Sequence, residues 1–174
     1  MRRGTRFALI AAIAVGAAVA GYAVNERWRA GSQAEASAAL LSAPLTDLQG
    51  QSRSIDAWRG QVLVVNFWAT WCVPCQDEIP VFIKLQKQHG ARGLQFIGIA
   101  IDQREKVDAF VRDFGINYPV LLGGMDAVEL SRRAGNRRGA LPYTVMIDRS
   151  GRLVGTHLGI VKEAKLESLL QPLF

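Results

Sequence analysis

Apolar residues gather in two ways along this 174-residue chain. Near the N-terminus, one uncharged apolar run extends over eighteen residues, from Phe7 to Val24. From Pro44 onward the apolar runs are much shorter, and stretches with apolar residues at helical spacing lie between them. This pattern predicts three parts, which are an N-terminal apolar helix in residues 1–24, a weakly helical linker in residues 25–43, and a folded domain in residues 44–174.

The short apolar runs of the domain predict β-strands. Val62–Phe67 and Leu94–Ile101 are almost continuously apolar, which is typical of strands covered on both faces. Tyr143–Asp148 and Arg152–Leu158 are separated by a tight turn and therefore run antiparallel. Further extended segments are predicted at residues 118–122 and, as a hairpin with its turn near Gly50, at residues 47–52.

The stretches between these strands predict helices. Val73–His89 reads as a helix that ends at Gly90, and Glu105–Phe114 has its apolar residues on one face. Shorter helices are predicted at residues 125–134 and 162–170. The alternation of strands and helices predicts an α/β domain with a mainly parallel sheet, an N-terminal β-hairpin extension and a small central insert.

Positive charge is concentrated before the long apolar run. Arg2, Arg3 and Arg6 supply half of the formal net charge of +6. A helix of about eighteen residues just crosses the hydrocarbon core of a bilayer, and arginines that flank it stay on the cytoplasmic side. The segment therefore predicts one N-terminal transmembrane helix in the inner (cytoplasmic) membrane, with the folded domain facing the periplasm.

A cleaved signal peptide is the alternative for the same segment. Ala18-Val19-Ala20 has the small-residue pattern that signal peptidases cut. Cleavage would release the domain into the periplasm. Both alternatives export the domain, so disulfides can form and persist in it.

Composition excludes two other classes of function. Beyond the first arginines the charge is nearly balanced, and no aromatic residues interleave with a basic stripe, so we expect no nucleic-acid partner. His89 and His157 are not spaced with the two cysteines as zinc ligands, so we also expect no structural zinc site and assign no residue as a metal ligand. His89 is expected to interact with its helix C-terminus, and His157 to be structural.

The chain has only two cysteines, Cys72 and Cys75, at the start of the helix that follows the first buried strand. A disulfide that closes so short a loop adds little stability, which disfavours a structural staple. At a helix N-terminus, unpaired N–H groups and the helix dipole stabilise a thiolate. We therefore expect Cys72 to be the nucleophile, Cys75 to be the more buried resolving thiol, and Pro74 to limit the backbone between them.

The sequence WCVPC after VNFWAT resembles the thioredoxin fold, and within it the exported disulfide reductases of the TlpA/ResA/CcmG type, over residues 44–174. Cys-Val-Pro-Cys is most similar to the TlpA branch. Pro80 matches a helix-kinking proline of thioredoxin-like proteins. Leu141-Pro142 matches the family's cis-proline loop, which faces the cysteines and shapes the groove for a substrate chain.

Glu78 matches the acid that marks the exported reductases. Thioredoxin has a buried aspartate where this chain has Asn66, and an amide exchanges no proton. Glu78 lies one helical turn from Cys75 on the same helix face. We therefore expect Glu78 to be the general acid and base for Cys75, or to tune the two thiol pKa values, with Asn66 as a supporting residue.

The surroundings of the motif give the expected substrate-binding residues. Trp71 is expected at the binding surface, together with Pro74, Leu141 and Pro142, while Trp68 is expected to pack inside. Four arginines precede Pro142. They either form a solvated basic loop or lie on the rim of the groove and attract acidic partners; they are Arg132, Arg133, Arg137 and Arg138.

The resemblance implies a thiol:disulfide oxidoreductase that reduces disulfides in exported proteins through a mixed disulfide, without a cofactor. Its expected partners are apocytochrome c or copper-assembly proteins as clients and a membrane thiol as electron donor, and the domain is expected to be a monomer. Three alternatives remain open: an oxidant that introduces disulfides, a Cu(I)-binding chaperone that uses the same thiols, and a peroxidase. The P-x-x-x-T-x-x-C context of peroxidatic cysteines does not precede Cys72.

Overall fold

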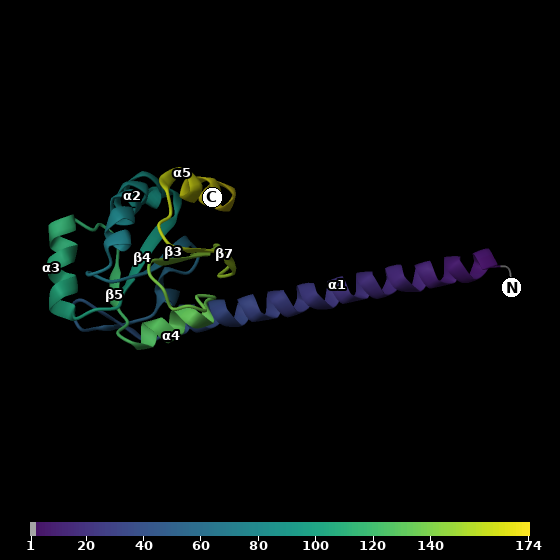
Figure 1. Cartoon of the computed structure of the whole chain (residues 1–174). Coiled ribbons are helices and arrows are strands. Elements are labelled where there is room, and N and C mark those ends of the chain that lie inside the picture. The colour runs from purple at the N-terminus through teal and green to yellow at the C-terminus, as the bar shows by residue number, and fades with distance from the viewer. Residues whose placement is uncertain (1–2) are drawn as a thin grey trace. The chain divides into compact units, whose positions relative to one another are not determined.

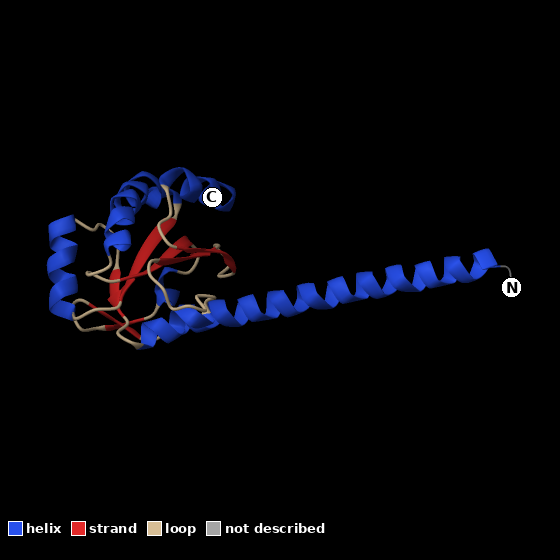
Figure 2. Ribbon diagram, in the orientation of Figure 1, coloured by secondary structure: helices blue, strands red, loops and turns tan. Residues whose placement is uncertain are grey.

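The computed structural model describes residues 3–174, with side-chain surroundings for all of these except residues 3–10, 12 and 29. The chain divides into two compact units, Met1–Glu35 and Ala36–Phe174. The described part of the first unit is helical and belongs to helix α1 (Arg3–Ser42). The second unit contains the sheet and all other helices that the structure describes (Figures 1 and 2).

The N-terminal anchor predicted over residues 1–24 falls partly outside the described residues. Within the part of the chain that is described, no helix has an apolar stretch long enough to cross a bilayer.

The folded unit contains the strands and helices that the apolar pattern predicts, with end points that differ by one or two residues. The strands are β1 (Leu45–Asp47), β2 (Ser52–Arg53), β3 (Val62–Trp68), β4 (Leu94–Ala100), β5 (Val120–Leu122), β6 (Tyr143–Ile147) and β7 (Leu153–Leu158). The helices after α1 are α2 (Val73–His89), α3 (Arg104–Phe114), α4 (Asp126–Arg133) and α5 (Glu163–Leu170), with 3₁₀ turns at Ile55–Trp58, Gly90–Arg92 and Gln171–Leu173.

The strands form one sheet in the order β2-β1-β5-β4-β3-β6-β7. The prediction of a mainly parallel sheet is wrong, since only the β3–β4 and β4–β5 pairs are parallel among the described pairings. The predicted N-terminal hairpin forms, and its strand β1 then pairs antiparallel with β5. Strand β6 lies antiparallel to β3, and β7 lies antiparallel to β6. The sheet is therefore mixed, with a parallel centre and antiparallel edges.

Helices cover the sheet on both faces, which explains why every residue of β3 is buried. Side chains of a strand alternate between its two faces. Val62, Val64 and Trp68 pack against α2, α3 and α5, whereas Leu63, Val65 and Phe67 pack on the side of α4 and the end of α1 (Figure 1). Asn66 has the register of Val64 and Trp68, so its side chain faces α2.

The folded unit begins at Ala36 rather than at the predicted boundary of Pro44. Leu40 and Leu41 are buried in the core next to Ile55 and Leu63, and the Ser37 hydroxyl donates a 2.5 Å hydrogen bond to the Gly151 carbonyl. The end of the predicted linker is therefore part of the domain. Composition did not indicate this, because the alanines and serines around the two leucines are typical of linkers.

Candidate active site

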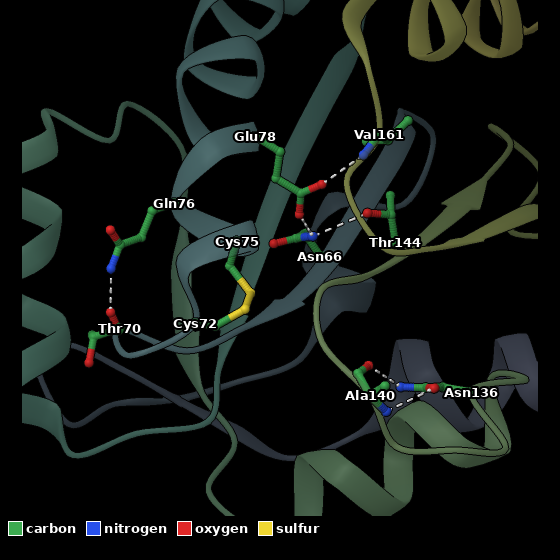
Figure 3. Close-up of a disulfide and its surroundings, with 10 residues drawn as sticks. All are labelled: Asn66, Thr70, Cys72, Cys75, Gln76, Glu78, Asn136, Ala140, Thr144 and Val161. Atoms are coloured by element: carbon green, nitrogen blue, oxygen red, sulfur yellow. Dashed lines mark hydrogen bonds between the residues drawn. A yellow bond between two sulfur atoms is a disulfide. The ribbon is translucent and has the colours of Figure 1, made fainter.

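The two cysteines lie where strand β3 of the sheet ends and helix α2, which covers the sheet, begins. Cys72 is the N-cap residue of α2, and Cys75 lies in the first turn. Cys75 N–H and Gln76 N–H both donate to the Cys72 carbonyl, at 3.0 and 3.2 Å. The two sulfurs form a disulfide, with the Cα atoms 5.2 Å apart (Figure 3). The structure is therefore that of the oxidised protein.

Cys75 is more buried than Cys72, as the sequence predicted. Cys75 is fully buried and Cys72 retains 5% exposure, whereas the adjacent Trp71 and Val73 are 67% and 65% exposed. Of the two cysteines, only Cys72 has any surface that an incoming disulfide can reach from solvent. Cys75 can then act from behind, on a mixed disulfide that has already formed.

A buried carboxyl lies behind Cys75. Glu78 is fully buried on the same face of α2, and both of its oxygens accept hydrogen bonds (Figure 3). Oε1 accepts from Asn66 Nδ2 at 2.7 Å, and Oε2 accepts from the Val161 backbone N–H at 3.1 Å. Asn66 Nδ2 also donates to Thr144 Oγ1 at 3.1 Å. The cluster joins α2, β3, β6 and the segment before α5.

Strand register explains how these residues meet. Asn66 on β3 lies directly opposite Thr144 on β6, so both side chains are on the α2 face of the sheet. Sequence reasoning named Glu78 and Asn66 but missed Thr144 and Val161. Both are far from the motif in the sequence, and nothing in their local pattern indicates a polar contact.

Burial raises the pKa of Glu78 from its ordinary value of 4.5 to about 7, against the opposing effect of the hydrogen bonds from Val161 and Asn66. At neutral pH this carboxyl can therefore both accept and donate a proton. Tyr118 is buried close by, and its pKa is raised by burial and, to a smaller extent, by the Glu78 carboxyl. The combination of a thiol and a carboxyl that titrates near pH 7 suits proton transfer during thiol exchange.

The predicted cis-proline loop is present. The Leu141–Pro142 peptide bond is cis, and Pro142 is buried just before β6. Asn136, 2% exposed, holds the loop in place. Its Oδ1 accepts from Ala140 N–H at 3.2 Å, and its Nδ2 donates to the Ala140 carbonyl at 2.9 Å (Figure 3). Sequence reasoning missed Asn136, since a lone asparagine in a loop has no distinguishing pattern.

A groove of about 630 Å³ connects this loop with the cysteines. Three segments line it, and they are Trp71–Pro74, the start of α4, and the loop before Pro142. Of the four predicted substrate-binding residues, the structure places Trp71, Pro74 and Leu141 in this lining, next to Cys72. Pro142 lies one residue beyond it. The single residue Ile101, after β4, completes the wall.

A second polar group lies at the residues that precede Cys72. The Thr70 hydroxyl donates a short hydrogen bond to Asp102 Oδ2. Gln76 Nε2 donates to the Thr70 carbonyl at 2.8 Å, as Figure 3 shows. These contacts hold the residues before Cys72 against the end of β4. Asp102 lies two residues after β4, a parallel strand next to β3. Polar residues at the carboxyl end of such a strand often serve a site, and this signal could have identified Asp102.

The other residues predicted around the site have varied surroundings. Trp68 is buried against Phe110, with ring centroids 5.1 Å apart, which confirms its packing role. Pro80 lies inside α2 and is exposed. His89 contacts Arg92, and His157 contacts the Ile160 carbonyl. Among the described residues, no group of three or more potential ligands could hold a metal ion.

Comparisons with known proteins agree with this geometry. The family model described as Redoxin matches residues 29–170. The thiol-disulfide oxidoreductase ResA of Halalkalibacterium halodurans is 30% identical over 145 residues, which cover 82% of this chain and 76% of the relative. The ResA of Geobacillus kaustophilus is 28% identical over 128 residues, 73% of this chain and 71% of the relative.

Solved structures show the same likeness. A structure described as a thiol:disulfide interchange protein, thioredoxin family protein, from Chlorobium tepidum superposes with a TM-score of 0.63 at 31% identity. The match covers 75% of this chain and 94% of that chain.

Proposed function

We propose a direction of reaction, a mechanism and a class of clients for this chain. The chain belongs to the Redoxin family and is a thiol:disulfide oxidoreductase of the ResA and CcmG type. In our proposal it reduces disulfides in exported proteins. The observation that carries the proposal is the carboxyl of Glu78, buried behind Cys75 and held by Asn66 and Val161.

The reaction begins with the reduced protein. The Cys72 thiolate attacks one sulfur of the client disulfide, a mixed disulfide forms, and the first client sulfur leaves as a thiolate. Glu78 takes the proton of the Cys75 thiol. The Cys75 thiolate then attacks the Cys72 sulfur and closes the disulfide seen in the structure, and the second client sulfur leaves. Two electrons pass from the protein to the client. Glu78 then releases the proton that it took from Cys75, and the two client thiolates take their protons from this carboxyl and from the solvent that received the Cys72 proton on ionisation.

Glu78 also supports the reductive direction. A dithiol protein is a strong oxidant when its thiolate form is strongly stabilised. The Glu78 carboxylate repels a thiolate on Cys75, and this repulsion makes the thiolate form of the reduced protein less stable. The residues that line the groove around Cys72 are all uncharged, so no cation of this lining favours the Cys72 thiolate. The disulfide state is therefore favoured, and the dithiol gives its electrons up readily.

The proposal includes the location and the electron source. Export by the N-terminal segment, as an anchor or as a cleaved signal, puts the domain in the periplasm, beyond the cytoplasmic thiol pool. Electrons then come from a membrane thiol donor. The clients that we propose are apocytochromes c or copper-assembly proteins, and the domain acts as a monomer.

The reduction potential of the full chain tests the direction. The protein is equilibrated with thiol–disulfide buffers, quenched with acid and alkylated. Because the chain has only two cysteines, the extent of alkylation gives the reduced fraction of the Cys72–Cys75 pair. We expect a potential at or below about −200 mV, as for thioredoxin and glutaredoxin. A potential near about −120 mV would make the protein an oxidant that introduces disulfides, and would overturn the reductive direction.

A further inference from the structure

The groove beside Cys72 is apolar in its lining and charged at one end. Its lining residues carry no charge, and two of them are largely exposed, Trp71 at 67% and Met125 at 77%. The loop that closes the groove continues backward from Gly139 into Arg138 and Arg137, whose side chains are both exposed. The groove therefore leads from an apolar floor onto a pair of cations.

These two arginines differ from their neighbours. Arg132 and Arg133 on α4 both lie within 3.7 Å of Glu129, which balances part of their charge. Arg137 and Arg138 make no ion pair with any residue that the structure describes. The acidic residues of α4, Asp126 and Glu129, line a separate cavity next to Leu45 and Leu122, on the other side of the helix.

The backbone under the two arginines is well fixed. Arg137 N–H donates to the Gly135 carbonyl and Gly139 N–H donates to the Asn136 carbonyl, both at 2.9 Å. Gly139 has a φ of +61°, a left-handed conformation that favours glycine. The buried Asn136 side chain then joins this turn to Ala140 in the groove wall. The backbone that carries Arg137 and Arg138 is thus fixed to the wall of the groove.

We infer that Arg137 and Arg138 select clients whose disulfide is flanked by acidic residues, with the apolar side chains next to the client cysteine packed between Trp71 and Met125. This inference rests on the proposed function, because it names the substrate class of the same site. An acidic segment along the loop would form charge-assisted hydrogen bonds with the two guanidinium groups. Such complementarity chiefly raises the rate of association and suppresses clients of the opposite charge.

The test uses the reduced full chain and three small disulfides in single-turnover reactions. Two are synthetic peptides with one intramolecular disulfide each, flanked by glutamates in one and by lysines in the other. The third is the uncharged bis(2-hydroxyethyl) disulfide. For the acidic peptide at low salt, we expect Arg137→Glu with Arg138→Glu to lower the second-order rate constant about tenfold. At about 1 M salt, where the Debye length is about 3 Å, the difference should nearly disappear.

Two controls separate charge at this loop from other effects. The uncharged disulfide should react equally with wild type and variant, because the cysteines and Glu78 are unchanged. A second variant, Lys87→Glu with Lys165→Glu, makes the same change in net charge at exposed residues outside the groove lining, and should keep the wild-type rate with the acidic peptide to within about twofold.

The outcomes distinguish this inference from the proposed function. If the wild type reduces all three disulfides but reacts no faster with the acidic peptide than with the basic one, the inference is overturned and the function stands. If the wild type reduces none of them, the proposed function fails and the inference fails with it. If the double glutamate variant does not fold, Arg137→Gln with Arg138→Gln replaces it, and an unchanged preference of that variant for the acidic peptide would overturn the inference.

Discussion

Behind Cys75 the protein is polar and closed to water, whereas beside Cys72 it is apolar and open to it. The closed side holds Glu78, Asn66 and Thr144, which are at most 3% exposed and joined by hydrogen bonds. The open side presents Trp71 and Met125, both more than 60% exposed. One disulfide separates the two environments, as Figure 3 shows for the closed side.

The difference teaches which side controls which property. Charges and protons interact strongly where water is absent, so we propose that the closed side controls the thiol pKa values and the rate of the second exchange step. The open side can change its side chains with little effect on folding, so we propose that it controls which client approaches. Substitutions should therefore separate into those that alter chemistry and stability and those that alter client choice.

The largest effect is expected from the cysteines themselves, which connect the two sides. Cys72→Ser and Cys75→Ser should both abolish turnover, but only Cys75→Ser should accumulate a mixed disulfide with a client, because its nucleophile remains and its resolving thiol is lost. Non-reducing electrophoresis and mass spectrometry detect the adduct. A stable adduct with Cys72→Ser alone would reverse the two roles.

Glu78→Gln should change how the stability of the oxidised protein depends on pH. The pKa of Glu78 is raised in the folded state, so its protonated form stabilises the fold at low pH and this stability is lost as pH rises through about 7. From pH 4.5 to above 7, the free energy of unfolding of wild type should therefore fall by about 3 kcal/mol relative to the variant. Denaturant unfolding at several pH values measures this, and parallel curves would show that the carboxyl titrates as it does in the unfolded chain.

Asn66→Ala should lower the free energy of unfolding by about 2 kcal/mol, because it removes hydrogen bonds to two buried oxygens. Thr144→Val is the matched control, since it removes only the outer bond of the same cluster, at about 1 kcal/mol. Asn66→Ala should also raise the pKa of Glu78 further, by loss of a donor to the carboxylate. Equal losses in the two variants would mean that the bond to Glu78 contributes nothing.

The smallest effect on folding is expected on the open side. Met125→Ser should change the free energy of unfolding by less than about 0.5 kcal/mol, since the side chain is largely exposed. It should nonetheless slow the reaction with an apolar peptide disulfide severalfold, and leave that with bis(2-hydroxyethyl) disulfide unchanged. If the reactions with both disulfides were slowed equally, Met125 would affect the thiol chemistry, as the closed side does, rather than the choice of client.

Much of the fold follows from local patterns, and these were readable in the sequence. The helix from Val73 to His89 and the buried strand at Val62 have the predicted starts because periodicity and capping are local properties. The mixed sheet was not predicted, because the pairing of β1 with β5 depends on contacts across the domain. Leu40 and Leu41 were assigned to a linker for the same reason.

The candidate site shows a similar division. The cysteines, Glu78 and Asn66 lie within thirteen residues of one another, so motif and spacing identified them. Thr144, Val161 and Asn136 reach the site from remote parts of the chain, and only the folded structure brings them there. On the closed side, Glu78 and Asn66 could thus be predicted from the sequence, but Thr144 and Val161 could not. The shape of the groove could not be predicted either.

The central claim is that Glu78 moves the proton of Cys75, and its most direct test is the pH dependence of mixed-disulfide resolution. The rate constant is measured with a preformed adduct on Cys72, in wild type, in Glu78→Gln, and in Asp77→Asn as a control that removes an exposed carboxyl one residue away. We predict that the wild-type rate constant rises with pH through an inflection near pH 7, and that Asp77→Asn has the same profile. In Glu78→Gln the rate constant at pH 7 should be lower by about 10²-fold, and the inflection should be absent. A Glu78→Gln profile that coincides with wild type would contradict the account.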